Sequence, residues 1–200
     1  MIWIISDTHF NHANVINYCN RPWNDRKEMD EALIKQWNSQ VKSDKELVYV
    51  LGDFCMAGKN YTKSILDRLK GTKILIKGNH DKPAHKMLEL GFDKVYENTI
   101  ITLVGNNNKK YEVYASHFPY HPMTSYKWNE KKIHMTLPDK MDKRYLHKRI
   151  VDDGKSWLLH GHVHQAWKIK GRQINCGVDV WDYKLIPHTK IIEIIEGEKE

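Results

Sequence analysis

Short apolar runs alternate with segments of helical periodicity in the first half of the chain. Residues 2–6, 47–51 and 74–76 are compact runs rich in β-branched residues, which is typical of strands buried on both faces. Apolar positions between residues 29 and 41 follow a helical stripe, and Asp25 precedes them as an N-cap. Shorter helical patterns cover residues 13–19 and 61–69.

The second half of the chain changes to hairpin patterns. Residues 99–104 and 111–115 flank a turn, and residues 167–175 form a smaller hairpin. A further apolar run at 157–159 predicts a strand, and isoleucines at 191–195 predict a docked helix. Strands that alternate with helices in the first half, followed by hairpins in the second, favour a layered α/β fold with mixed sheets. The sequence shows no repeats or linkers, which predicts one domain, residues 1–200.

Five of the predicted strands end in residues that can bind a metal ion. Ligand-binding groups collect beyond the carboxyl ends of strands in α/β sheets, so these residues are expected to converge. Asp7 with His9, and His162 with His164, are spaced two apart, which on an extended segment places both side chains on one side. Gly52, Gly78 and Gly161 precede candidates, where close backbone approach is required. The candidates are Asp7, His9, Asp53, Asn79, His80, His117, His162 and His164.

Taken in order, these motifs resemble those of the calcineurin-like metallophosphoesterases. The blocks are Asp7-x-His9, Gly52-Asp53, Gly78-Asn79-His80-Asp81, His117 and Gly161-His162-x-His164. Residues 6–14 and 177–183 are similar to a compact bacterial and phage-type metallophosphatase branch of that superfamily. The resemblance implies a four-layer α-β-β-α sandwich with two mixed β-sheets and two metal ions at the strand ends.

The resemblance also implies a role for each residue. Asp7, His9, Asp53 and His164 would hold one divalent ion, and Asp53, Asn79, His117 and His162 the second, with Asp53 bridging. His80 would act as general acid or stabilise an oxygen of the substrate, and Asp81 would orient His80. Nitrogen and oxygen ligands suit Mn²⁺, Fe, Zn²⁺, Ni²⁺ or Co²⁺, and we expect Mn²⁺ to serve in assays.

These features predict a dimetal-dependent phosphohydrolase in which hydroxide attacks the phosphorus of a phosphodiester, with a small or cyclic nucleotide-type substrate. The alternatives are a phosphomonoesterase acting on nucleotides or phosphoproteins, an RNA or single-stranded DNA nuclease, and a non-catalytic scaffold. No arginine stands at an obvious phosphate-clamping position beside the motifs, which disfavours a phosphoprotein phosphatase. The complete set of motif residues disfavours the scaffold.

The charge distribution adds a candidate substrate-binding segment. The 200 residues include 32 Lys and Arg against 25 Asp and Glu, a net charge of +7 that favours anionic partners. Residues 121–150 contain eight basic and three acidic residues, a net +5, with aromatic residues between them. Aromatic rings can stack on bases while cations contact phosphates, so a lid-like excursion at about 118–156 is a candidate nucleotide- or nucleic-acid-binding element, although a solvated excursion explains it equally well. The candidate substrate contacts are Asn11, His12, Arg144 and Lys148.

Apolar runs and cysteine usage predict a cytoplasmic protein with no membrane partner. No apolar run approaches the length of a transmembrane helix, and the first residues lack the features of a signal peptide. The three cysteines have no metal-like spacing and suit free thiols in a reducing compartment.

Overall fold

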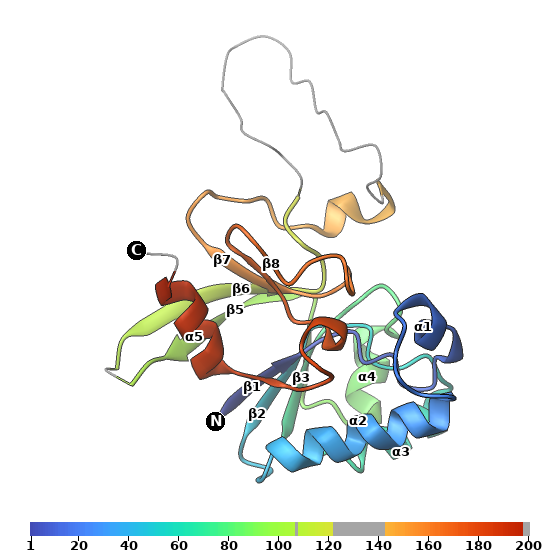
Figure 1. Ribbon diagram of the computed structural model, residues 1–200. Coiled ribbons are helices and arrows are strands. Elements are labelled where there is room, and N and C mark those ends of the chain that lie inside the picture. The colour runs from blue at the N-terminus through green and yellow to red at the C-terminus, as the bar shows by residue number, and fades with distance from the viewer. Residues whose placement is uncertain (107, 122–142, 198–200) are drawn as a thin grey trace.

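Two mixed β-sheets packed face to face form the centre of the structure, a computed structural model that describes residues 1–106, 108–121 and 143–197 (Figure 1). The first sheet has the strand order β10-β1-β2-β3-β4, in which β1 to β4 are parallel and β10 is antiparallel to β1. Its strands are β1 (Ile2–Ile5), β2 (Leu47–Val50), β3 (Thr72–Ile76), β4 (Lys94–Tyr96) and β10 (Ile186–Pro187).

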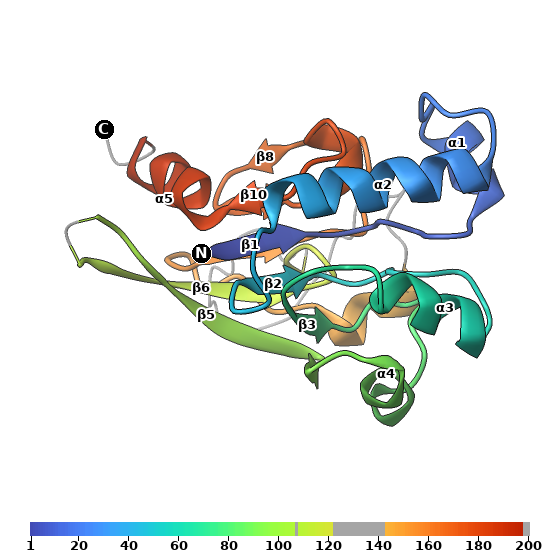
Figure 2. The same ribbon diagram turned by 90° about the horizontal axis from the view of Figure 1, so that it is seen from below.

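Helices from the first half of the chain cover the outer face of this sheet. Figure 2, a view from below, shows α2, α3 and α4 on the side of the first sheet that faces the viewer. The long helix α2 begins where predicted, because the Asp25 carboxylate accepts the backbone N–H groups of Lys27 and Glu28 at 2.7 and 2.9 Å. The helices are α1 (Ala13–Tyr18), α2 (Arg26–Gln40), α3 (Lys59–Leu66) and α4 (Ala84–Leu90).

The second sheet has the strand order β5-β6-β7-β9-β8. The hairpin pairs β5 with β6 and β8 with β9 are antiparallel, whereas β6, β7 and β9 run parallel to one another. Two 3-10 helices lie on either side of β7, β8 and β9 in the sequence: η1 (Lys143–Lys148) precedes β7, and η2 (Val178–Val180) follows β9. The strands are β5 (Asn98–Val104), β6 (Lys110–Ser116), β7 (Trp157–His160), β8 (Ile169–Lys170) and β9 (Gln173–Asn175).

Successive residues of the central strands face two different cores. Ile5 and Leu75 belong to the core beneath the helices, whereas Ile4 and Ile76 belong to the core between the sheets. Side chains alternate between the faces of a strand, so a strand covered on both faces is apolar at every position. This arrangement explains the continuous apolar runs in the sequence.

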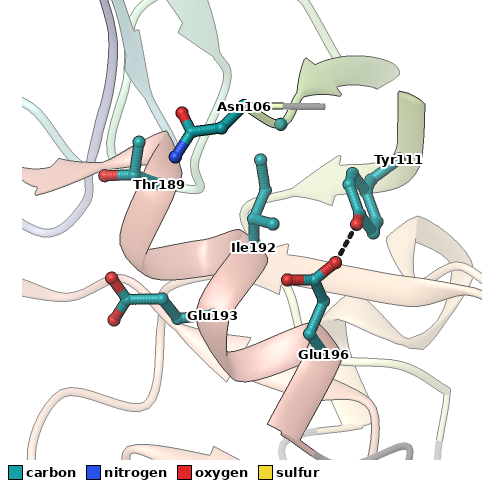
Figure 3. Close-up of a pocket in the computed structure, with 7 residues that line it drawn as sticks. Asn106, Tyr111, Thr189, Ile192, Glu193 and Glu196 are labelled. Atoms are coloured by element: carbon teal, nitrogen blue, oxygen red, sulfur yellow. Dashed lines mark hydrogen bonds between the residues drawn. The ribbon is translucent and has the colours of Figure 1, made fainter. Parts of the chain in front are cut away.

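The C-terminal helix α5 (His188–Gly197) packs against the core between the sheets. It contributes Ile191, Ile192 and Ile195 to that core, and the Tyr111 hydroxyl of β6 donates a hydrogen bond to Glu196 on α5 (Figure 3). The mixed α/β architecture, with two mixed sheets and associated helices, agrees with the prediction. Among the described residues, no helix is long and apolar enough to cross a membrane.

Candidate metal centre

The predicted ligands lie in the loops that follow β1, β2, β3, β6 and β7, and most of these residues adopt left-handed backbone conformations. Asp7, His9 and Asp53 have φ angles of 55°, 51° and 51°, and His162 and His164 have 71° and 46°. A residue with a Cβ pays roughly 1–2 kcal/mol for such a conformation. Five strained residues at one edge of the sheets therefore lower the stability of the fold, and their conformations orient the side chains of the candidate ligands.

Hydrogen bonds between the loops hold these conformations. The backbone N–H of Asp7 donates to the Gly52 carbonyl at 3.1 Å, and that of His9 donates to the Asp53 carbonyl at 3.0 Å. The His162 N–H donates to the Asp7 carboxylate at 3.0 Å. Three loops from different strands are thereby fixed to one another before any ion binds.

Two of the glycines make the close packing of these loops possible. A Cβ on Gly161 would collide with the Ser6 hydroxyl and the Asp7 carboxylate, and a Cβ on Gly78 would collide with the side chain of Asp53. The prediction that glycine is needed for close approach beside the ligands is consistent with both positions.

The first ligand group consists of Asp7, His9 and His164, whose ligand atoms lie within 4.8 Å of one another. Both ring nitrogens of His9 are buried and lack a hydrogen-bond partner. Burial holds the pKa of His9 well below its ordinary value, so the ring is neutral and can offer a lone pair. Buried polar atoms are nearly always satisfied, so an orphaned imidazole beside carboxylates fits a metal ion as its missing partner.

The second group consists of Asp7, Asp53 and His117, again within 4.8 Å. The Nδ1 of His117 is 2.8 Å from the Leu51 carbonyl, which can only accept, so Nδ1 carries the hydrogen. The Nε2 atom then faces the Asn79 Oδ1 at 3.1 Å and the Asp53 Oδ2 at 3.4 Å. This is the orientation of a ligating histidine whose other nitrogen is anchored to the protein.

Asp53 lies between the two groups, as a bridging ligand would. Its Oδ2 is 3.7 Å from the Nε2 of His9 and 3.4 Å from the Nε2 of His117. Burial lowers the pKa of His117, but the charge and hydrogen bond of Asp53, together with the charge of Asp7 and the Leu51 carbonyl, outweigh burial and raise the pKa to about 9. Two divalent ions would replace this proton and balance the buried carboxylates.

The remaining predicted ligand, His162, adjoins the second group. Its ring centroid is 5.2 Å from that of His117 in an edge-to-face arrangement, and burial lowers its pKa to about 3. The structure thus brings all seven predicted ligands to one edge: Asp7, His9, Asp53, Asn79, His117, His162 and His164.

His80 and Asp81 differ in what they contact. His80 is exposed, its ring centroid is 5.7 Å from that of His9, and its backbone N–H donates to the Asp53 carboxylate at 2.9 Å. The Asp81 carboxylate accepts the backbone N–H groups of Asp53, Phe54 and Gly78 at 2.8–3.0 Å. We expected Asp81 to orient His80, but its hydrogen bonds show that it ties together the two turns that bear Asp53 and Asn79.

Arg21 and Asp179 form a buried network that the sequence analysis did not assign. Their side chains are 0% and 1% exposed, and the Arg21 Nε and Nη2 donate to the two carboxylate oxygens of Asp179 at 2.8 and 3.1 Å. Arg21 also donates to the Thr8 and Asp7 carbonyls at 2.9 and 2.8 Å. Asp179 in turn faces the His164 Nδ1 at 2.9 Å. The only signal for Asp179 in the sequence was its place within residues 177–183.

This network sets the protonation of His164. Burial lowers the pKa of His164, but the hydrogen bond to Asp179, the interaction with Cys19 and the charge of Asp7 together outweigh burial and raise the pKa to about 10. With hydrogen on Nδ1, the Nε2 atom is the one available to an ion.

The predicted substrate contacts have different surroundings. The His12 ring lies 5.2 Å from that of His9, whereas the Asn11 N–H is bound to the Asp30 carboxylate at 3.0 Å. The Lys148 Nζ is 3.9 Å from Glu97. Arg144 belongs to η1, but its side chain is outside the described part, as is most of the basic segment 121–150, namely residues 122–142.

A cluster of strand-end carboxylates and imidazoles of this kind is typical of the metal centre of a metal-dependent hydrolase. Residues 1–176 match the model of the calcineurin-like phosphoesterase family, and the chain belongs to that family of metal-dependent phosphoester hydrolases. The ligand groups found here accord with the dimetal centre of the family.

Similar proteins cover nearly the whole chain. The uncharacterized protein MJ1445 of Methanocaldococcus jannaschii is 33% identical over an alignment of 207 positions that covers 99% of this chain and 93% of the relative. The gene 66 protein of Mycobacterium phage D29 is 29% identical over 221 residues, with 100% and 98% coverage, and agrees with the compact phage-type branch. The crystal structure of a protein of unknown function, AQ665 from Aquifex aeolicus, has a TM-score of 0.63 and 27% identity, covering 97% and 98% of the two chains.

Proposed function

We propose that this phosphoesterase hydrolyses small phosphodiesters of nucleotide type and that residues 1–200 act as one catalytic domain. The observation that carries the proposal is an aromatic wall formed by Phe118 and Tyr145 beside the second ligand group. The two rings stack with centroids 5.1 Å apart at 25°, and they lie 4.9 and 5.8 Å from the ring of His162. A diester carries an organic group on either side of the phosphorus. Phe118 is buried, so the half-buried ring of Tyr145 is the part of this wall that a base or another flat group could reach.

The surroundings of Arg21 support a diester over a monoester. A phosphomonoester carries nearly one more negative charge at neutral pH, because its second pKa is about 6. Enzymes commonly bind such a dianion through two parallel hydrogen bonds from an arginine side chain. Arg21 is instead turned inward to Asp179 and to backbone carbonyls, so it is not available to a phosphate.

The chain's own residues would prepare the substrate for hydrolysis. Two divalent ions, for which Mn²⁺ is our choice, would supply a hydroxide nucleophile at neutral pH and attract the phosphoryl oxygens. Asp7, Asp53, Asn79 and the four ligating histidines would hold these ions. His80 stands exposed at the rim with its backbone tied to Asp53, where its imidazole can donate a proton to the leaving alkoxide. A cytoplasmic location belongs to this proposal and agrees with three free, buried cysteines.

The test compares initial rates on bis-p-nitrophenyl phosphate and p-nitrophenyl phosphate. Chelator-stripped protein is assayed with and without Mn²⁺, beside His80→Ala and, as control, His85→Ala, another exposed histidine. We expect diester cleavage that requires Mn²⁺, falls by roughly 10²–10⁴-fold in His80→Ala and is retained in His85→Ala. A preference for the monoester would overturn the diester assignment.

The aromatic wall has its own variants. Tyr145→Ala should raise the KM for the diester about tenfold, since stacking on one ring contributes about 1–3 kcal/mol, whereas Tyr145→Phe should leave KM nearly unchanged. Equal KM values for both variants and the parent protein would show that the aromatic wall does not contribute to binding of the diester. No turnover of either substrate, together with failure to bind two Mn²⁺ per chain, would indicate a scaffold.

A further inference from the structure

A cavity of about 480 Å³ adjoins the aromatic wall and has a basic lining. Its walls include Lys77 after β3, Glu97 between β4 and β5, Phe118 after β6, and Lys148 and Arg149 at the end of η1. The space is within the size range of small-ligand sites. Neither the ligand groups nor the proposed role of His80 involves this cavity.

Two lysines of this cavity, Lys77 and Lys148, face the carboxylate of Glu97. The Lys77 Nζ is 3.2 Å from Glu97 and the Lys148 Nζ is 3.9 Å from it, while the Arg149 guanidinium lies 5.9 Å from the ring centroid of Phe118. The Lys77 side chain is only 14% exposed, whereas that of Glu97 is 61% exposed. Two ammonium groups beside one outward-lying carboxylate leave a net positive charge of about one at this part of the cavity, which favours an anion.

The cavity shares a wall with the metal centre. Phe118 lines the cavity and also contacts the rings of His117 and His162, with centroids 4.9 Å from each. Lys77 is two residues from the predicted ligand Asn79, at the end of the same strand. A substrate whose phosphodiester lies at the ligands and whose flat group lies against Tyr145, which stacks on Phe118, could therefore direct its far end toward Lys77.

We propose that this cavity binds a second phosphate, carried on one organic arm of the diester. The preferred substrates are then diesters that bear a further phosphate, as two or more joined nucleotides do. The inference rests on the proposed phosphodiesterase function and adds a specificity site formed by Lys77 and Lys148, with Glu97 limiting the charge. Lys77 acts on binding of the substrate, so its effect belongs in KM and not in kcat.

The experiment uses two chromogenic substrates that differ by one phosphate: the p-nitrophenyl ester of thymidine 5′-phosphate, with a free or a phosphorylated 3′ hydroxyl. The parent protein should favour the phosphorylated substrate about tenfold in KM, the effect of one charge-assisted contact. Lys77→Met should abolish this preference and keep the rate on the other substrate. Lys86→Met, an exposed lysine on α4, is the matched control and should retain the preference.

Glu97→Gln gives a prediction of opposite sign. Removal of the carboxylate should strengthen binding of the phosphorylated substrate by about threefold, because the lysines keep their charge and lose their partner. A dinucleotide and a longer single-stranded oligonucleotide, used as competitors, distinguish a small from a polymeric substrate, and weaker competition in Lys77→Met than in the parent protein supports the site.

Failure of this inference can be told apart from failure of the proposed function. Cleavage of bis-p-nitrophenyl phosphate without any preference for the added phosphate overturns the second-phosphate site alone. A preference that survives Lys77→Met, or a weaker preference in Glu97→Gln, overturns it as well. Absence of all diester cleavage overturns the proposed function.

Discussion

Replacement of Asp179 by asparagine tests whether the buried network positions one of the two metal ions. Asp179 joins Arg21 to His164, and Arg21 also binds the carbonyl of Asp7. His164 belongs to the first ligand group, with Asp7 and His9, and not to the second group, which Asp7 shares with Asp53 and His117. We therefore expect Asp179→Asn to weaken the first ion and to leave the second nearly unaffected.

The magnitude follows from what the carboxylate does. It accepts from the Arg21 Nε and Nη2 and from the His164 Nδ1 at 2.8–3.1 Å, and an amide offers only one acceptor oxygen to these donors. Loss of a carboxylate behind a ligating histidine typically reduces metal affinity 10–100-fold, about 1.4–2.7 kcal/mol. The unpaired charge of buried Arg21 would also cost folding stability, about 3–5 kcal/mol.

The assay is equilibrium dialysis against graded free Mn²⁺, followed by metal analysis. The parent protein should bind two ions, and in Asp179→Asn one of the two binding steps should move to 10–100-fold higher Mn²⁺. Asp152→Asn is the control, because Asp152 forms a half-exposed pair with Arg172 at 2.9 Å in the second half of the chain.

Stability is measured in parallel by urea unfolding, and Asp179→Glu keeps the charge beside Arg21 if the asparagine variant does not fold. The glutamate variant should lose affinity at the same step by a smaller factor. Equal weakening of both steps, or unchanged affinity in a folded Asp179→Asn protein, would refute the reasoning.

Three further predictions concern packing, pH and metal removal. Gly161→Ala should abolish retention of Mn²⁺ after dialysis, because its Cβ would collide with the groups that hold the Asp7 loop, whereas Gly58→Ala, where the added Cβ meets nothing, should bind normally; equal retention would contradict the close-approach argument. His160 is fully buried against Trp167 and burial lowers its pKa to about 3, so the unfolded chain binds a proton near pH 6.5 that the folded chain does not, and stability should fall by up to about 1.4 kcal/mol per pH unit as the pH drops from 6.5 toward 3. Urea unfolding of metal-free protein at pH 7.5 and 5.0 should show this loss, and His160→Gln should reduce it; an equal loss in both proteins would assign it to other groups. Chelation should lower the Tm of the parent protein, since Mn²⁺ at about 100 times its Kd stabilises the fold by about 2.7 kcal/mol, and a Tm unchanged by chelation would argue against ions at these ligands.

Local patterns were sufficient for the parts of the structure that depend on neighbouring residues. The apolar runs located β1, β2 and β3, and Asp25 located the start of α2, because strand burial and helix capping are decided within a few residues. The edge strands β4 and β10 were not predicted. Their residues are few and partly exposed, and they are strands only because a neighbouring strand offers hydrogen bonds.

The candidate ligands could be found from the sequence because each follows a strand that the sequence reveals. The sequence by itself thus determined which residues meet at the sheet edge, from Asp7 to His164, and with them the class of chemistry. It did not determine how that edge is held. Arg21 and Asp179 are 158 residues apart, and Asp81 binds the turn of Asp53 in place of His80. Such contacts have no periodicity along the chain, because a buried polar group takes whichever partner the packing of distant segments brings to it, and only the tertiary structure decides that.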